Sequence, residues 1–80
     1  MHLFPTTITK LDAVVFHGET DSVTVPGVEG EMTVLKDHVP LLTTFREGKI
    51  ILRRESKVVE EFSVQKGTIE VSKHGVTILI

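Results

Sequence analysis

The stretch that decides the fold runs from residue 25 to residue 42 and reads Val25-Pro-Gly-Val-Glu-Gly-Glu-Met-Thr-Val-Leu-Lys-Asp-His-Val-Pro-Leu-Leu42. A Pro-Gly turn, a second glycine, two carboxylates, a histidine and an apolar Pro-Leu-Leu segment lie here between two strand-like runs. No residue that could act as a nucleophile has a general base near it at a spacing that a known catalytic motif uses. The stretch therefore carries no catalytic signature. It predicts instead a shaped polar loop on a β scaffold, which suits a docking surface.

The rest of the chain has the pattern of short β-strands. Turn residues recur at short intervals, and the runs between them are rich in Val, Ile, Thr and Phe. Residues 21–26, 57–64, 68–72 and 75–80 place apolar side chains at every second position. No window of helical length has an apolar stripe with a 3.6-residue period. The sequence therefore predicts an all-β fold, an antiparallel β-sandwich of about ten short strands.

Length and composition limit the kind of protein further. Eighty residues, 40% apolar and 25% charged, are enough for one folded domain that spans 1–80 and too few for a second core. The net charge is −2 with both signs interleaved, and the chain has no cysteine. These features argue against disulfides and thiol chemistry and against a strong electrostatic field. No run approaches the roughly 20 apolar residues that span a bilayer, so we expect no membrane insertion.

Three ligand-binding interpretations of the motifs are disfavoured by the residues around them. The glycines of residues 27–31 could suit a phosphate loop, but no Gly-Lys-Ser/Thr follows and two carboxylates would repel phosphate. The four histidines are scattered, without the spacing of metal ligands. The basic stretch 46–57 is interleaved with glutamates, and the chain has no Trp or Tyr for base stacking. We therefore expect no metal, no cofactor and no nucleic acid.

Two features of the central stretch keep a structural and a functional interpretation open. His38 follows Glu31 by seven residues, so the two could simply contact each other or could share a docking surface. The apolar segment 39–42 could be core, or its proline could place it at a sheet edge that receives a partner protein.

Five motifs in order, from residue 14 to residue 80, resemble the N-terminal β-sandwich domain of the epsilon subunit of the rotary F-type ATP synthase. The sequence differs from the usual family pattern at Thr33, where a glycine is usual, and at the Lys36-Asp37 pair, where Pro-Gly is common. The motifs are Val15-Phe16-His17-Gly18-Glu19, the run 21–27, Glu29-Gly30-Glu31, the run 38–43, and Gly67 with Ile69-Glu70-Val71 before the closing strand 76–79.

The resemblance implies a ten-stranded sandwich at the foot of a rotor stalk, a structural and coupling subunit with no catalytic residue. It implies contact with the membrane c-ring through Glu29, Glu31 and His38, and with the gamma subunit through Leu42 and Thr43. The location implied is peripheral, on the cytoplasmic face of the bacterial inner membrane. The subunit would transmit rotation between ion translocation and ATP synthesis.

Longer members of that family continue into a C-terminal helical domain, which in some of them binds ATP. We expect the present chain to be a short form without that domain and without ATP binding. The alternative function is a free-standing β-sandwich that binds a ligand such as a carbohydrate. Sugar-binding faces commonly use Trp or Tyr platforms, and this sequence contains neither.

Overall fold

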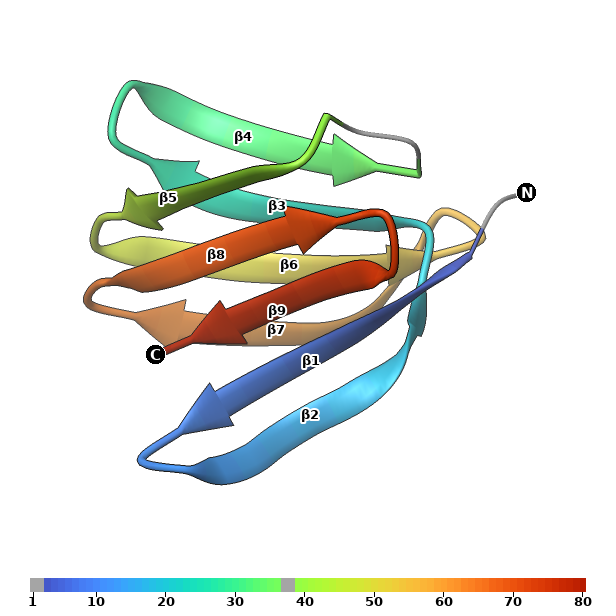
Figure 1. The fold of residues 1–80 in the computed structure, drawn as a ribbon, viewed down its shortest axis with the longest axis horizontal. Helices are drawn as coiled ribbons and strands as arrows, with labels where there is room; N and C mark the ends of the chain where they lie inside the picture. The colour runs from blue at the N-terminus through green and yellow to red at the C-terminus, as the bar shows by residue number, and fades with distance from the viewer. Residues whose placement is uncertain (1–2, 37–38) are drawn as a thin grey trace.

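The computed structural model of the chain describes residues 3–36 and 39–80, and every regular element within them is a β-strand. Figure 1 shows the strands, which run nearly along one direction of the molecule. In chain order they are β1 (Phe4–Lys10), β2 (Ala13–Thr20), β3 (Ser22–Gly27), β4 (Gly30–Leu35), β5 (Leu41–Phe45), β6 (Gly48–Arg54), β7 (Lys57–Val64), β8 (Gly67–Ser72) and β9 (Gly75–Leu79).

The strands form one hydrogen-bonded sheet that folds over on itself. The order is β2-β1-β9-β8-β5-β3-β6-β7, and β4 pairs with the other side of β3. Strands β5 and β3 are joined by the single residue pair Gly27–Phe45, and there the sheet turns back. The result is a front layer of β2, β1, β9, β8 and β5 over a back layer of β4, β3, β6 and β7, visible in Figure 1. The predicted all-β sandwich is confirmed.

Two details differ from the predicted antiparallel arrangement of about ten strands. The residues that the structure describes form nine strands, and β1 pairs with β9 in parallel, from Thr6–Val76 to Thr9–Leu79. These two strands lie at opposite ends of the sequence, so no tight hairpin turn forces them to run in opposite directions. All the other strand pairs are antiparallel, as expected.

The core follows the alternation of the sequence. Val23 and Val25 on β3, and Ile69 with Val71 on β8, all point between the layers and are buried. Alternate residues of a strand point to opposite faces, so each such pair contributes to one side only. The buried apolar set is Phe4, Ile8, Val23, Val25, Val34, Phe45, Ile50, Leu52, Val64, Ile69, Val71, Val76 and Ile78.

Three threonines, Thr6, Thr20 and Thr24, are buried in addition to the apolar residues. Thr24 lies on the face of β3 opposite Val23, yet it is only 5% exposed, because β4 and β6 flank β3. Its hydroxyl is hydrogen-bonded to that of Thr33 at 3.0 Å. Thr33 itself is exposed, whereas Thr6 and Thr20 are both fully buried and their hydroxyls are hydrogen-bonded at 2.8 Å. A buried hydroxyl that lacked a partner would cost free energy, and these pairs remove that cost.

Gly67 should tolerate no side chain. A Cβ at this position would overlap the carbonyl oxygen of Leu79 and the ring of Phe45, whereas a Cβ at Gly18 would meet only the tip of the Phe16 ring at 3.2 Å. We expect Gly67→Ala to lower the free energy of unfolding by about 1–3 kcal/mol through overpacking. Gly18→Ala should change it by no more than about 0.5 kcal/mol. Urea titrations of both variants test this, and equal losses would contradict the packing described.

Candidate functional site

The acidic turn (residues 28–31) joins β3 to β4 at one end of the sandwich. Glu29 lies in the turn itself, and Glu31 lies on β4 opposite Pro26. Both side chains are exposed. Within residues 3–36 and 39–80, neither carboxylate has a hydrogen-bond or ion-pair partner. Two uncompensated acids are therefore available to an external cation or donor.

Arg46, in the turn between β5 and β6, holds the acidic turn in place. Its backbone N–H donates to the carbonyl of Pro26 at 2.9 Å, and its Nη1 donates to the carbonyl of Val28 at 3.2 Å. The two contacts fix the backbone on which Glu29 is carried. An arginine fork suits this task, because its planar donors keep a defined direction.

The turn-like sequence predicts that Gly27, at the end of β3, and Gly30, in the acidic turn, both adopt φ values that other residues resist. Gly30 does so, with a φ of 121°. For Gly27 the prediction is wrong, because its φ is not positive. Its backbone is instead close to that of Gly30, where a Cβ would lie 2.7 Å from the Gly30 carbonyl oxygen.

The remaining predicted interface residues are Leu42, Thr43 and His38. Leu42 and Thr43 are neighbours on β5, so their side chains point to opposite sides of the front layer. Leu42 points outward and is 69% exposed, while Thr43 is half-buried opposite Ile69. His38 lies outside the described residues, so its predicted relation to Glu31 stays a prediction.

Part of the outer side of the front layer is a nearly uncharged surface, here named the threonine face; exposed Glu19, opposite Pro5, lies on the same side beyond it. The threonine face consists of two aligned rows of side chains that cross all five strands. Ten residues make it up, of which only Glu70 carries a formal charge when His17 is neutral. The rows are Leu42–Glu70–Thr77–Thr7–His17 and Thr44–Thr68–Leu79–Thr9–Val14.

Hydrogen bonding within the threonine face is local. The Thr7 hydroxyl is hydrogen-bonded to Nδ1 of His17 at 2.8 Å across β1 and β2.

The sequence alone did not predict this face, because each strand contributes only two residues to it. The alternation of each strand indicated which side chains point outward, but the register between strands distant in sequence was needed to align them.

The outer side of the back layer has the opposite character. Lys49 on β6 and Glu61 on β7 form an exposed ion pair of 3.4 Å. Arg53 lies on the same strand as Lys49, and its Nη1 donates to Thr24 at 3.4 Å. The predicted pairing of interleaved basic and acidic residues is thus observed for Lys49 and Glu61. Such exposed pairs contribute little to stability.

Other kinds of site are not formed by the part of the chain that the structure describes. No group of three or more His, Cys, Asp or Glu side chains within residues 3–36 and 39–80 could hold a metal ion. The described residues also include no helix that is long and apolar enough to cross a membrane. The geometry defines a small β-sandwich with two distinct exposed surfaces, the threonine face and the acidic turn.

Comparison with known proteins identifies the family. The model of the ATP synthase delta/epsilon chain β-sandwich domain matches residues 3–80. The chain belongs to this family, which confirms the resemblance inferred from the sequence.

The relatives are epsilon chains of bacterial ATP synthases. The ATP synthase epsilon chain of Caulobacter vibrioides is 42% identical over 65 residues, covering 81% of this chain and 74% of the relative. Those of Sulfurimonas denitrificans and Herminiimonas arsenicoxydans are 39% and 34% identical, over 86% and 98% of this chain. The chain spans only about half the length of these two relatives, 53% and 56% respectively.

Solved structures agree on the fold. A chain of the Euglena gracilis mitochondrial ATP synthase, solved with its OSCP, F1 and c-ring parts, superposes with a TM-score of 0.86 at 22% identity. The match covers 96% of this chain and 49% of that one. A chain in the central stalk and c-ring structure from Tetrahymena thermophila gives a TM-score of 0.78 at 15% identity, covering 95% and 61%.

Removal of the Arg46 side chain should loosen the acidic turn. We expect Arg46→Ala to lower the free energy of unfolding by about 0.5–1 kcal/mol, because one hydrogen bond at the surface is lost. Amide hydrogen exchange at residues 28–31 should become faster. Arg54→Ala is the control, since its Nη1 bonds the Glu19 carbonyl at a longer 3.4 Å and far from the turn. Unchanged exchange at the turn in Arg46→Ala would contradict the role given to Arg46.

Proposed function

We propose that this chain is a non-catalytic rotor subunit of a rotary ATP synthase. It links the gamma subunit to the c-ring, so that ion translocation is coupled to ATP synthesis. Support comes from membership of the delta/epsilon family and from relatives that are named ATP synthase epsilon chains. In a bacterial cell the subunit would lie at the cytoplasmic face of the inner membrane, peripheral to the membrane sector.

The threonine face is the observation that carries the proposal. Interface cores are depleted of charged residues relative to the rest of a protein surface. Nine of the ten positions on this face are formally neutral, whereas Lys49, Arg53 and Glu61 lie on the outer side of the back layer. We assign the gamma subunit to the threonine face, with Leu42 as an exposed apolar contact. Thr43, which is half-buried on the other side of β5, would contribute less directly.

The acidic turn is the proposed contact with the c-ring. Glu29 and Glu31 are exposed, and neither carboxylate is paired with another described residue. Arg46 holds their backbone, so the acids would meet a partner with little reorganisation. The turn lies at the end of the layers, while the threonine face lies on their side (Figure 1). Two partners could therefore bind at once. His38 belongs to the same proposal on the strength of the family resemblance.

No catalytic step is assigned to the chain. The acids of the turn have no nucleophile beside them among the described residues, and their role is electrostatic recognition. The alternative of a carbohydrate-binding module gains no support from the structure, since the chain has no Trp or Tyr to form a sugar platform. The proposal also keeps the expectation that this domain does not bind ATP.

An arginine in place of Leu42 should prevent gamma binding. Leu42→Arg would put a charge into the proposed interface, and we expect affinity for the isolated gamma subunit to fall at least about tenfold. Because the side chain is exposed, thermal unfolding of the free domain should be unchanged. Val58→Arg is the matched control, as Val58 is 53% exposed on β7 of the back layer. Calorimetric titration measures both, and wild-type affinity in Leu42→Arg would exclude this face.

Charge reversal in the acidic turn should impair coupling without unfolding the domain. Glu31→Lys places the wrong sign against a partner that is complementary to an acid. The free energy of unfolding should stay within about 0.5 kcal/mol of wild type. Proton or sodium pumping driven by ATP in membrane vesicles should fall. Glu60→Lys, exposed on β7, serves as control. If Glu31→Lys unfolds the domain while assembled enzymes pump normally, the residue is structural.

A further inference from the structure

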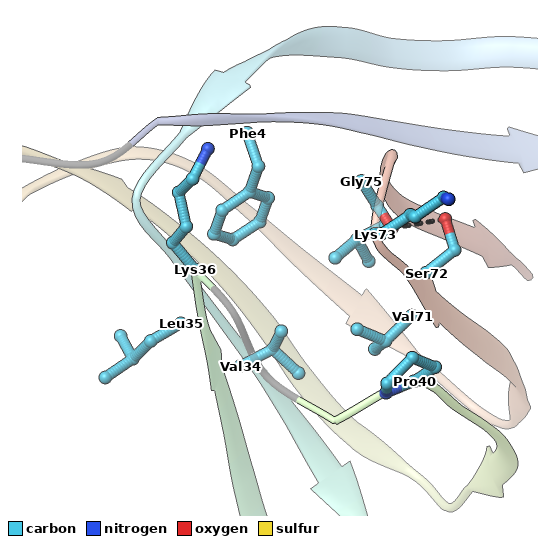
Figure 2. Close-up of a pocket in the computed structure, with 10 residues that line it drawn as sticks. Phe4, Val34, Leu35, Lys36, Pro40, Val71, Ser72, Lys73 and Gly75 are labelled. Atoms are coloured by element: carbon cyan, nitrogen blue, oxygen red, sulfur yellow. Dashed lines mark hydrogen bonds between the residues drawn. The ribbon is translucent and has the colours of Figure 1, made fainter.

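An apolar cavity opens between the two layers at the end of the sandwich opposite the acidic turn. Its volume is about 300 Å³. Figure 2 shows it between the end of β4, the segment before β5, the β8–β9 turn and the start of β1. The described residues that line it are Phe4, Val34, Leu35, Lys36, Pro40, Val71, Ser72, Lys73, Gly75 and Val76.

The floor of the cavity is the end of the hydrophobic core. Phe4, Val34, Val71 and Val76 are each 7% exposed or less and belong to the core cluster. In Figure 2 the side chains of Val34 and Val71 lie on either side of the same open space. Burial of apolar surface is favourable, so an open pocket with an apolar floor favours an occupant with an apolar group. The volume reaches the lower end of the range for small-ligand sites.

Among the described residues, the charged side chains on the rim of the cavity are two lysines. Lys36 and Lys73 are both exposed and lie on opposite sides of the opening in Figure 2. No carboxylate occurs among the described lining residues. Ser72 is already engaged, because its hydroxyl donates to the Gly75 carbonyl and accepts from the His74 N–H. Among the described lining residues, the two lysines are therefore the groups that would favour an occupant with a negative charge beside an apolar group.

The cavity adjoins the threonine face. Pro40 on its rim precedes β5, the strand that carries Leu42 on the outer side. Leu35, also on the rim, is 57% exposed. An exposed leucine next to an open apolar cavity suits contact with a protein, since an apolar anchor inserted into a pocket is a frequent centre of binding energy.

We propose that the cavity receives an apolar side chain from the partner subunit, flanked there by a carboxylate that pairs with Lys36 and Lys73. The partner is the gamma subunit assigned to the threonine face, so this inference rests on the proposed function. The anchor would be a residue such as Leu, Met or Phe. Its insertion would fix the relative position of the two proteins, while the broader threonine face would provide most of the buried contact area.

The first experiment tests the charges. The double variant Lys36→Glu/Lys73→Glu and the matched control Lys57→Glu/Lys66→Glu, whose lysines do not line the cavity, are titrated with the isolated gamma subunit. We expect at least tenfold weaker binding for the cavity pair and less than threefold change for the control. The affinity of wild type should fall with added salt more steeply than that of the cavity double variant, because exposed charge pairs are screened.

The second experiment tests the apolar space. Val71→Leu extends a side chain into the cavity and should leave the free domain as stable as wild type or more stable. Binding to gamma should weaken at least fivefold, because the anchor no longer fits. Val58→Leu, on the exposed outer side of the back layer, is the control.

The outcomes separate this inference from the proposed function. If wild type binds gamma and Leu42→Arg does not, while the cavity variants bind as wild type, the cavity inference is overturned and the proposed function stands. If wild type fails to bind gamma at all, both fail together. If both sets of cavity variants bind gamma more weakly, while their thermal unfolding and the binding of the control variants are unchanged, the insertion of a gamma side chain into the cavity is supported.

Discussion

The structure depends on the point where one sheet becomes two layers. Gly27 and Phe45 form the only pair of residues that joins β3 to β5, and Phe45 is buried there. The ring of Phe45 packs on the backbone of Gly67, where even a Cβ would not fit. This close contact lets β5 leave β3 and continue beside β8 in the other layer. Because the sheet folds over here, the apolar sides of the two layers face each other and are covered.

The separation of the two layers gives the molecule two outer sides with different chemistry. The two rows of the threonine face contain five threonines and, when His17 is neutral, a single formal charge at Glu70. The back layer turns out residues such as Lys49 and Glu61. Charged side chains protect exposed sheets from non-specific association. The scarcity of charge in the two rows is the reason that we propose the threonine face as a surface for a specific partner.

Small size explains why all candidate sites lie on the surface. A chain of this length buries only about 60% of the surface of its unfolded form. The interior is filled by thirteen apolar side chains and a few threonines whose hydroxyls pair with each other. No buried side-chain nitrogen or oxygen of the described residues lacks a hydrogen bond. A cavity lies at one end, lined by described residues of both layers.

The sequence by itself determined the all-β class, the alternation in four of the nine described strands, the acidic turn and the family. These follow from local rules: a period of two for strands, glycine where φ is positive, and motifs in a fixed order. Only the tertiary structure decided the parallel pairing of β1 with β9, the burial of Thr24, the role of Gly27, the alignment of the threonine face and the cavity beside Lys36 and Lys73. The physical reason is that register between distant strands depends on how the whole core packs, and no local pattern in one strand specifies its neighbour.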